Sequence, residues 1–140
     1  MSFISFNWTT APLLCGAKTV TRRKWVPRYA RMFREGQEVT AYDHSPRNGG
    51  QPVAIIKLLN TPFLQSVEAM TTDDWIAEGF QFLHSHPELR PKRIFGHACE
   101  EDEFALHGGF ERWKQTRQTL YVVRFELLVR MRDVDCGPTG

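Results

Sequence analysis

The chain has 140 residues, a size at which one domain is expected and about 68% of the unfolded surface can be buried without disulfide or metal support. Hydrophobic residues make up 41%, charged residues 24% and the net charge is +2, which is ordinary for a globular protein and disfavours a general RNA binder with a strong basic excess. The apolar runs are too short for a membrane span, and MSFISFNWTT lacks the basic segment and cleavage site of a signal peptide.

The first part of the chain predicts a short helix and then a strand. The stretch NWTTAPLLCG favours a short helix that Thr9 or Thr10 would cap, with Gly16 in the left-handed position after its end. The following stretch, KTVTRR, is β-branched and polar, which is typical of a strand. A basic segment runs from Lys18 to Arg34 without an acidic residue, and it is either a solvated face or a patch for phosphate or nucleic acid.

Two further strands are expected around a turn. In REGQEVTAYD a tight turn at Gly36 leads into a strand that places Val39 and Ala41 on one face. Asn48 followed by glycine is a strong hairpin signal. The returning strand, PVAIIKLL, is apolar on both faces for most of its length, so we expect it at the centre of a sheet.

The second half changes character. In SVEAMTTDDWIAEGF, Thr71 and Asp74 resemble a helix capping box and Gly79 would end the helix. Residues 84–108 hold prolines, glycines, four histidines and an acidic run, so we expect mostly loop there. A further helix is expected in GFERWKQTR.

The clearest strand is TLYVVRFELLVRM, in which one side is apolar: Tyr121, Val123, Phe125, Leu127 and Val129. The last residues, DVDCGPTG, resemble a frayed tail. The final strand needs partners, and only the early strands can supply them. The element order therefore predicts an α+β fold, a mixed curled sheet or barrel with helices at its side.

Six segments together resemble, in order, those of the ASCH domain: GAKTVTRR, FREGQEVTAYD, PVAIIKLL, MTTDDWIAEGF, FERWKQ and TLYVVRFEL. The G-x-K-x-x-T-x-R pattern of the first segment is the most specific of them. The resemblance implies one PUA-like mixed β-barrel with flanking helices over residues 1–140, with a core at about 5–128 and a tail at 129–140. It also implies an association with RNA.

Some small bacterial members of this family are similar to an amidohydrolase that removes the acetyl group from N4-acetylcytidine. Carried across motif by motif, this resemblance implies a nucleophile at Thr21, an activating amine at Lys18 and a supporting carboxylate at Glu78, with Glu68 as the fallback. It implies neither a cofactor nor a metal. Other members are nucleases or binding modules, so an RNA-binding module without catalysis and a ribonuclease remain alternatives.

The residues themselves set conditions on this chemistry. On a regular strand Lys18 and Thr21 would face opposite ways, so Lys18 has to lie in a turn or in the loop after Gly16. To act as a base, Lys18 has to lose its proton near neutral pH, and a pKa lowered by about three units corresponds to on the order of 4 kcal/mol. A carboxylate at the end of a helix, as expected for Glu78, faces water or has a cationic partner such as Lys18.

Three further residues are candidates for ligand binding. A guanidinium forks onto phosphate or base acceptors, which suits Arg22 and Arg23, although a solvated edge strand explains them too. Among the aromatic residues Trp8, Trp25, Tyr29 and Trp113, we expect at most one to form a wall of a pocket, and Trp8 is our candidate. The expected partner is a small nucleoside or RNA, and no membrane is expected. The sequence does not define the oligomeric state.

Histidines and cysteines offer a rival site. HSH at 84–86, HAC at 97–99 and His107 contain zinc-type ligands, but their spacing is not that of a common zinc site, so we predict no metal. The three cysteines, Cys15, Cys99 and Cys136, form no CxxC pair and no evident disulfide framework. We therefore expect reduced thiols and a cytoplasmic protein.

Overall fold

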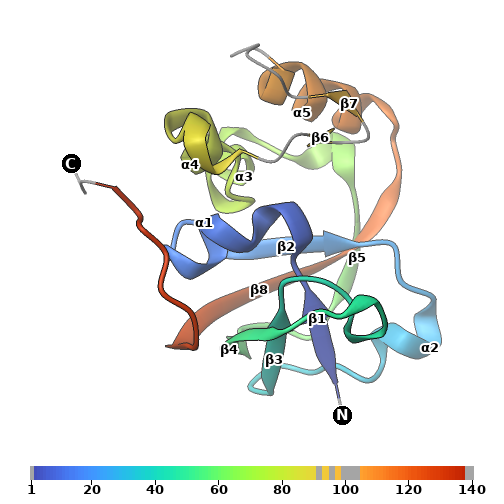
Figure 1. Ribbon diagram of the computed structural model, residues 1–140. Coiled ribbons are helices and arrows are strands. Elements are labelled where there is room, and N and C mark those ends of the chain that lie inside the picture. The colour runs from blue at the N-terminus through green and yellow to red at the C-terminus, as the bar shows by residue number, and fades with distance from the viewer. Residues whose placement is uncertain (1, 91–92, 95–96, 99–104, 138–140) are drawn as a thin grey trace.

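The computed structural model describes residues 2–90, 93–94, 97–98 and 105–137. Its strands are β1 Phe3–Ser5, β2 Val20–Arg23, β3 Glu38–Tyr42, β4 Pro52–Leu58, β5 Phe63–Ser66, β6 Arg93–Ile94, β7 His97–Ala98 and β8 Thr119–Arg130. Six of them form one curled sheet in the order β1-β3-β4-β8-β2, with β5 also paired to β8 (Figure 1). The pairing of β1 with β3 is parallel and the others are antiparallel, so the sheet is mixed.

The helices are α1 Thr10–Leu14, α2 Pro27–Ala30, α3 Thr72–Ala77, α4 Phe80–Ser85 and α5 Ala105–Gln115, and the 3-10 turns are η1 Asn7–Thr9, η2 Pro46–Asn48, η3 Val67–Ala69 and η4 Pro87–Leu89. Figure 1 shows α3, α4 and α5 gathered on one side of the sheet, while α2 lies at the other end. Helix α1 contacts both α4 and β8, so it joins the helical side to the sheet. None of the described helices is long and apolar enough to cross a bilayer.

Strand β8 holds the sheet together because it pairs with three others. Its first half pairs with β2 and β5, and its second half pairs with β4. The final strand therefore pairs with an early strand, β4, as expected, whereas no pairing with β3 occurs among the described residues. The expected single apolar face is wrong at its end: Val129 is 51% exposed, while Leu120 and Val122, on the opposite face, are buried.

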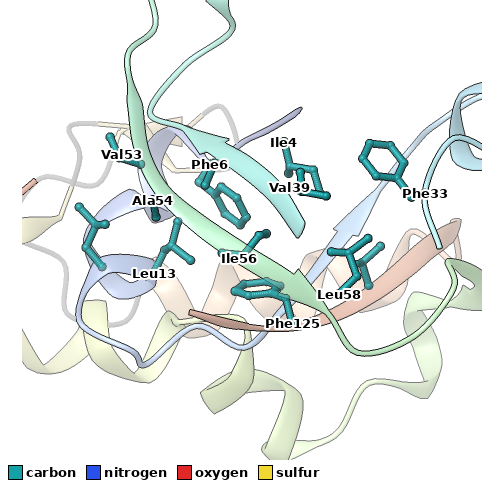
Figure 2. Packing of buried hydrophobic residues seen from close by; sticks show 13 residues of the cluster. Ile4, Phe6, Leu13, Phe33, Val39, Val53, Ala54, Ile56, Leu58 and Phe125 are labelled. Carbon is teal, nitrogen blue, oxygen red and sulfur yellow. The ribbon is translucent and has the colours of Figure 1, made fainter. Parts of the chain in front are cut away.

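Two apolar clusters explain this burial pattern. One fills the curl of the sheet with side chains from β1, α1, β3, β4 and β8; Figure 2 shows Phe6, Leu13 and Phe125 against Val53 and Ile56 of its central strand. The second cluster lies under the helices and consists of Val67, Met70, Trp75, Phe80, Leu83, Leu106, Phe110 and Leu120. The first half of β8 supplies residues to both clusters and is buried on both faces, whereas its end extends beyond them.

The predicted α+β class with a curled mixed sheet is confirmed, but a closed barrel is not observed. Strands β1 and β2 lie at the two ends of the hydrogen-bonded path, and no ladder joins them within the described chain. The central position of β4, between β3 and β8, is as predicted. So are the buried face of β3 at Val39 and Ala41, the left-handed backbone of Gly16 and the turn at Gly36.

Other sequence predictions need correction. Helix α4 begins at Phe80, directly after the left-handed Gly79, and its last two residues fall in the segment predicted as loop. Helix α5 begins at Ala105 rather than near residue 109. The predicted frayed tail is fastened, because Cys136 forms a disulfide with Cys15, across 121 positions of the sequence. Reduced thiols were therefore the wrong expectation for this pair, and cysteine spacing no longer supports a cytoplasmic location. Cys99 lies outside the described residues.

Candidate active site

Lys18 lies in a loop between α1 and β2, and this placement removes the conflict between its spacing and that of Thr21. Gly16 turns the chain at a φ of 77°, and the backbone N–H groups of Ala17 and Lys18 both donate to the carbonyl of Pro12, at 2.9 and 3.0 Å. The next N–H, of Thr19, donates to the carbonyl of Ala77 at 2.8 Å. The loop is thereby fixed both to α1 and to the end of α3.

Glu78 is the residue directly after α3, where the chain turns through Gly79 into α4. Its carboxylate oxygen Oε1 accepts a hydrogen bond from Lys18 Nζ at 2.9 Å, and its backbone carbonyl accepts a second at 3.0 Å. Both side chains are only 3% exposed. The cationic partner expected for a carboxylate at a helix end is therefore present, and the pair is shielded from water.

Arg22 holds the carboxylate from the other side. Its NH1 donates to Oε2 of Glu78 at 2.9 Å, and its NH2 donates to Asp74 at 2.8 Å and to Gln65 at 3.2 Å. Asp74 in turn accepts the backbone N–H of Thr71 at 2.9 Å, which caps α3. Because both terminal nitrogens of Arg22 are bound to protein acceptors, a ligand contact suits Arg23 better than Arg22.

Thr21 and Arg23 are two positions apart on β2 and face the same way. The Nε–H of Arg23 donates to Thr21 Oγ1 at 3.0 Å, and Thr21 is only 2% exposed. The guanidinium also lies 5.4 Å from the ring centre of Phe6. Within the described chain Arg23 makes no ion pair, and its terminal nitrogens form no hydrogen bond.

These groups meet at a cavity of about 290 Å³ whose walls come from both ends of the sequence: Phe6, Asn7, Trp8, Thr9, Lys18, Thr21, Arg22, Arg23, Lys24, Glu78, Phe80, Trp113, Gln118 and Leu120. Trp8 stacks on Phe80 with their ring centres 5.5 Å apart and their planes 6° apart. The structure thus brings Lys18, Thr21 and Glu78 to one cavity that has an aromatic wall. Its volume is at the lower limit of ordinary small-molecule sites, about 300–1,000 Å³.

Burial and charge shift the ionisation of the site. Burial lowers the pKa of Lys18; the negative charge of Glu78 opposes this, and Arg23 and Arg22 add to the lowering. Burial likewise lowers the pKa of Arg23 to about 10, against the opposing charge of Glu78. Burial alone would raise the pKa of Asp74, but the hydrogen bonds from Thr71 and Arg22 outweigh it, so this pKa lies below its ordinary value.

Two other candidates lie elsewhere. Glu68, the fallback carboxylate, is 54% exposed, pairs with Arg117 at 3.1 Å and does not line the cavity. In the rival histidine group, His84 and His107 have ring centres 5.1 Å apart, and the side chains of 97–99 lie outside the described residues. No group of three potential metal ligands occurs in the described part of the chain.

Sequence reasoning missed two parts of the site. Asp74 was assigned only to the helix cap, although it also binds Arg22, and Gln65 was not singled out at all. Asp74 carried one usable signal: it precedes Glu78 by four positions, so both carboxylates project from the same face of one helix. Gln65 reaches Arg22 through the pairing of β5 and β2 with β8, which no local pattern encodes.

The architecture defines an α+β protein with a half-barrel sheet and a polar cavity between its first strands and its helices. No family model and no curated protein match the sequence. Among solved structures, the chain is similar to protein EF3133 from Enterococcus faecalis V583, which is described by the family model DUF984. The TM-score is 0.51 at 15% identity, over 91% of this chain and 80% of that one. At this identity the likeness shows a shared fold and nothing about activity.

Proposed function

We propose that the protein is an amidohydrolase that cleaves the exocyclic N-acyl amide of a modified pyrimidine nucleoside, such as N4-acetylcytidine. The observation that carries the proposal is Lys18, a buried amine with a lowered pKa that shares a cavity with the hydroxyl of Thr21. Perturbed ionisable groups in a cleft are the usual mark of acid–base chemistry. The aromatic wall at Trp8 and Phe80 suits a flat base.

Hydrogen bonding supports a base role for Lys18. A neutral amine has two N–H groups and one lone pair. The contacts to the carboxylate and to the carbonyl of Glu78 use both N–H groups, so the lone pair remains available to accept a proton. Thr21 Oγ1 already accepts a hydrogen bond from Arg23, so its own proton is the one it can give away. The cavity thus offers the two groups that an activated nucleophile needs: a base, at Lys18, and a donor to the hydroxyl oxygen, at Arg23.

The proposed reaction has two stages. Thr21 Oγ attacks the acyl carbon while its proton passes to Lys18, and Arg23 stabilises the charge that develops on the reacting oxygens. Lys18 then gives the proton to the leaving amino group, and cytidine departs from an acyl-threonine ester. Water, deprotonated by Lys18, then attacks the ester; the Thr21 oxygen leaves and regains its proton from Lys18, and the carboxylic acid is released and ionises. Glu78 holds the amine in place or exchanges the proton with it.

Incubation with N4-acetylcytidine and, in parallel, with unmodified RNA tests the proposal. We expect cytidine and acetate to form with the native protein and with the control variant Thr19→Val, which changes an exposed threonine two residues before Thr21. We expect Thr21→Val to form neither product. Chromatography of both reactions measures the outcome.

Two results would contradict the proposal and select an alternative. Binding of RNA that weakens steeply with salt, without release of cytidine, would indicate a binding module, because phosphate contacts depend on counterion release. Shortening of the RNA would indicate a ribonuclease. Turnover of an uncharged nucleoside, in contrast, should change little with salt.

A further inference from the structure

The charges around Lys18 do not balance when the lysine is protonated. Among the described residues, the charged side chains around it are Asp74 and Glu78 at α3, and Arg22, Arg23 and Lys24 at β2 and just after it. Lys24 is exposed, and water screens its charge, so we leave it out of the sum of buried charges. The two carboxylates are balanced by the two guanidiniums alone.

A protonated Lys18 therefore adds one uncompensated positive charge to a shielded cluster. Its ion-pair partner, Glu78, is shared with Arg22, and an excess buried charge of this kind is costly, which favours loss of the proton. The lowered pKa of Lys18 agrees with this balance. This imbalance favours the neutral amine, and a single negative charge brought into the cavity would favour the protonated one.

The cavity has groups that can hold such a charge. The terminal nitrogens of Arg23 form no hydrogen bond within the described chain, and the residue lines the cavity next to Thr21. A guanidinium edge binds a carboxylate through two parallel hydrogen bonds. Protonation of Lys18 adds a third N–H beyond the two that bind Glu78, so the lysine gains a donor as it gains its charge.

From this juxtaposition we propose that the cavity binds a small monovalent carboxylate at Arg23, and that one proton enters with the anion and binds to Lys18. With Lys18 protonated, a single negative charge makes the cluster neutral, whereas a phosphate dianion would leave it with a net negative charge. The inference holds whether or not an amide is cleaved. If the proposed reaction does occur, its carboxylate product would leave only as Lys18 loses that proton, which links product release to pH.

Calorimetric titration of the native protein with sodium acetate tests the inference. Ionic strength is held constant with chloride, and the titration is repeated in two buffers of different ionisation enthalpy. Above the pKa of Lys18 we expect uptake of about one proton per acetate, and an affinity that falls about tenfold for each unit rise in pH. This readout needs neither a substitution nor turnover, so its failure is distinct from failure of the proposed function.

Substitutions assign the two roles. Arg23→Gln should abolish acetate binding, while Arg28→Gln, which removes an exposed charge from the same basic segment, should leave it unchanged. Lys18→Met should abolish the proton uptake, and near-UV circular dichroism checks that the variant is folded. Binding without proton uptake, uptake that persists in Lys18→Met, or absence of acetate binding to the native protein would each overturn the inference. Tighter binding of inorganic phosphate than of acetate would overturn the ligand class.

Discussion

Lys18 has a charge state that depends on three neighbours at once. Glu78 favours the charged amine, whereas burial and the two arginines favour the neutral one, and the net effect lowers the pKa of Lys18. Glu78 does not act on Lys18 alone, because its second oxygen is bound to Arg22 at 2.9 Å. Sharing the carboxylate lets Glu78 orient the lysine without holding it in the charged form.

Substitution of Glu78 distinguishes its two possible roles. If the carboxylate exchanges a proton during the reaction, Glu78→Gln should reduce kcat by about 10²–10⁴-fold. If it only orients the lysine, the loss of kcat should be smaller. Activity requires the neutral amine, and removing the negative charge lowers the pKa of Lys18 further, so the variant should stay active to lower pH. The pH profile of kcat/KM, measured for both proteins on N4-acetylcytidine, separates the cases. Lys18→Met should abolish turnover in either case.

The lowered pKa of Lys18 also makes the stability of the protein depend on pH. Unfolded, the amine regains its ordinary pKa of about 10.4, so between the two pKa values the unfolded state binds more protons than the folded state. The free energy of unfolding contributed by this group therefore rises with pH through that window. We expect urea denaturation of the native protein, relative to Lys18→Met, to show this rise as the pH increases toward the unfolded pKa of about 10.4. If the free energy of unfolding changed with pH in the same way for both proteins, the pKa of Lys18 would not be lowered in the folded state.

The short helices position the site through the turns that end them. The turn between α3 and α4 is made by Gly79, at a φ of 94°, directly after Glu78. A Cβ at this glycine would lie 2.8 Å from Cβ of Pro12 in α1 and 3.3 Å from Cβ of Lys18. The close approach of this turn to α1 is therefore what brings the carboxylate of Glu78 within reach of the lysine.

Gly79→Ala should both destabilise the protein and disturb the site. A left-handed backbone costs an alanine about 1–2 kcal/mol, and the contact with Pro12 adds to this cost. Gly36→Ala is a matched control, because Gly36 has a similar φ of 87° but no atom within 4 Å of the added Cβ. We expect both variants to lose stability in urea denaturation, Gly79→Ala more, and only Gly79→Ala to lose activity. Equal effects of the two substitutions would show that the close approach does not hold the site.

At the scale of the molecule, the C-terminal segment returns to the start of the chain and is fastened there. After β8, Arg132 pairs with Asp43, and the carbonyl of Cys136 lies 3.0 Å from Nε2 of His86. The disulfide then joins Cys136 to Cys15 at the end of α1, three residues before Lys18. The segment that follows the sheet thus supports the helix from which the Lys18 loop begins (Figure 1).

Loss of this disulfide should lower stability substantially. Because the bond closes a loop that spans most of the chain, Cys136→Ser should reduce the free energy of unfolding by about 2–5 kcal/mol. Dithiothreitol should have a comparable effect on the native protein and none on the variant. Thiol titration of the unreduced, denatured protein should detect only Cys99. Three titratable thiols, or stability that does not respond to the reductant, would contradict the pairing.

The sequence by itself determined the local features of this protein. The strand at β8, the buried face of β3 at Val39 and Ala41, the left-handed Gly16 and the turn at Gly36 are each encoded within a few neighbouring residues, because side-chain periodicity and glycine's freedom act over that range. The same reasoning left two arrangements open for Lys18, a turn or bulge before Thr21 or a place in the loop after Gly16, and the structure has the second.

Only the tertiary structure decided the rest. The binding of Asp74 and Glu78 by Arg22, the contact of Lys18 with Glu78 sixty positions away, and the disulfide between Cys15 and Cys136 all join distant segments. The burial of both faces in the first half of β8 depends likewise on helices that pack from elsewhere in the chain. The ionisation of the site belongs to this class, because burial lowers the pKa of Lys18 only when α3, α4 and β2 have packed together and excluded water from it.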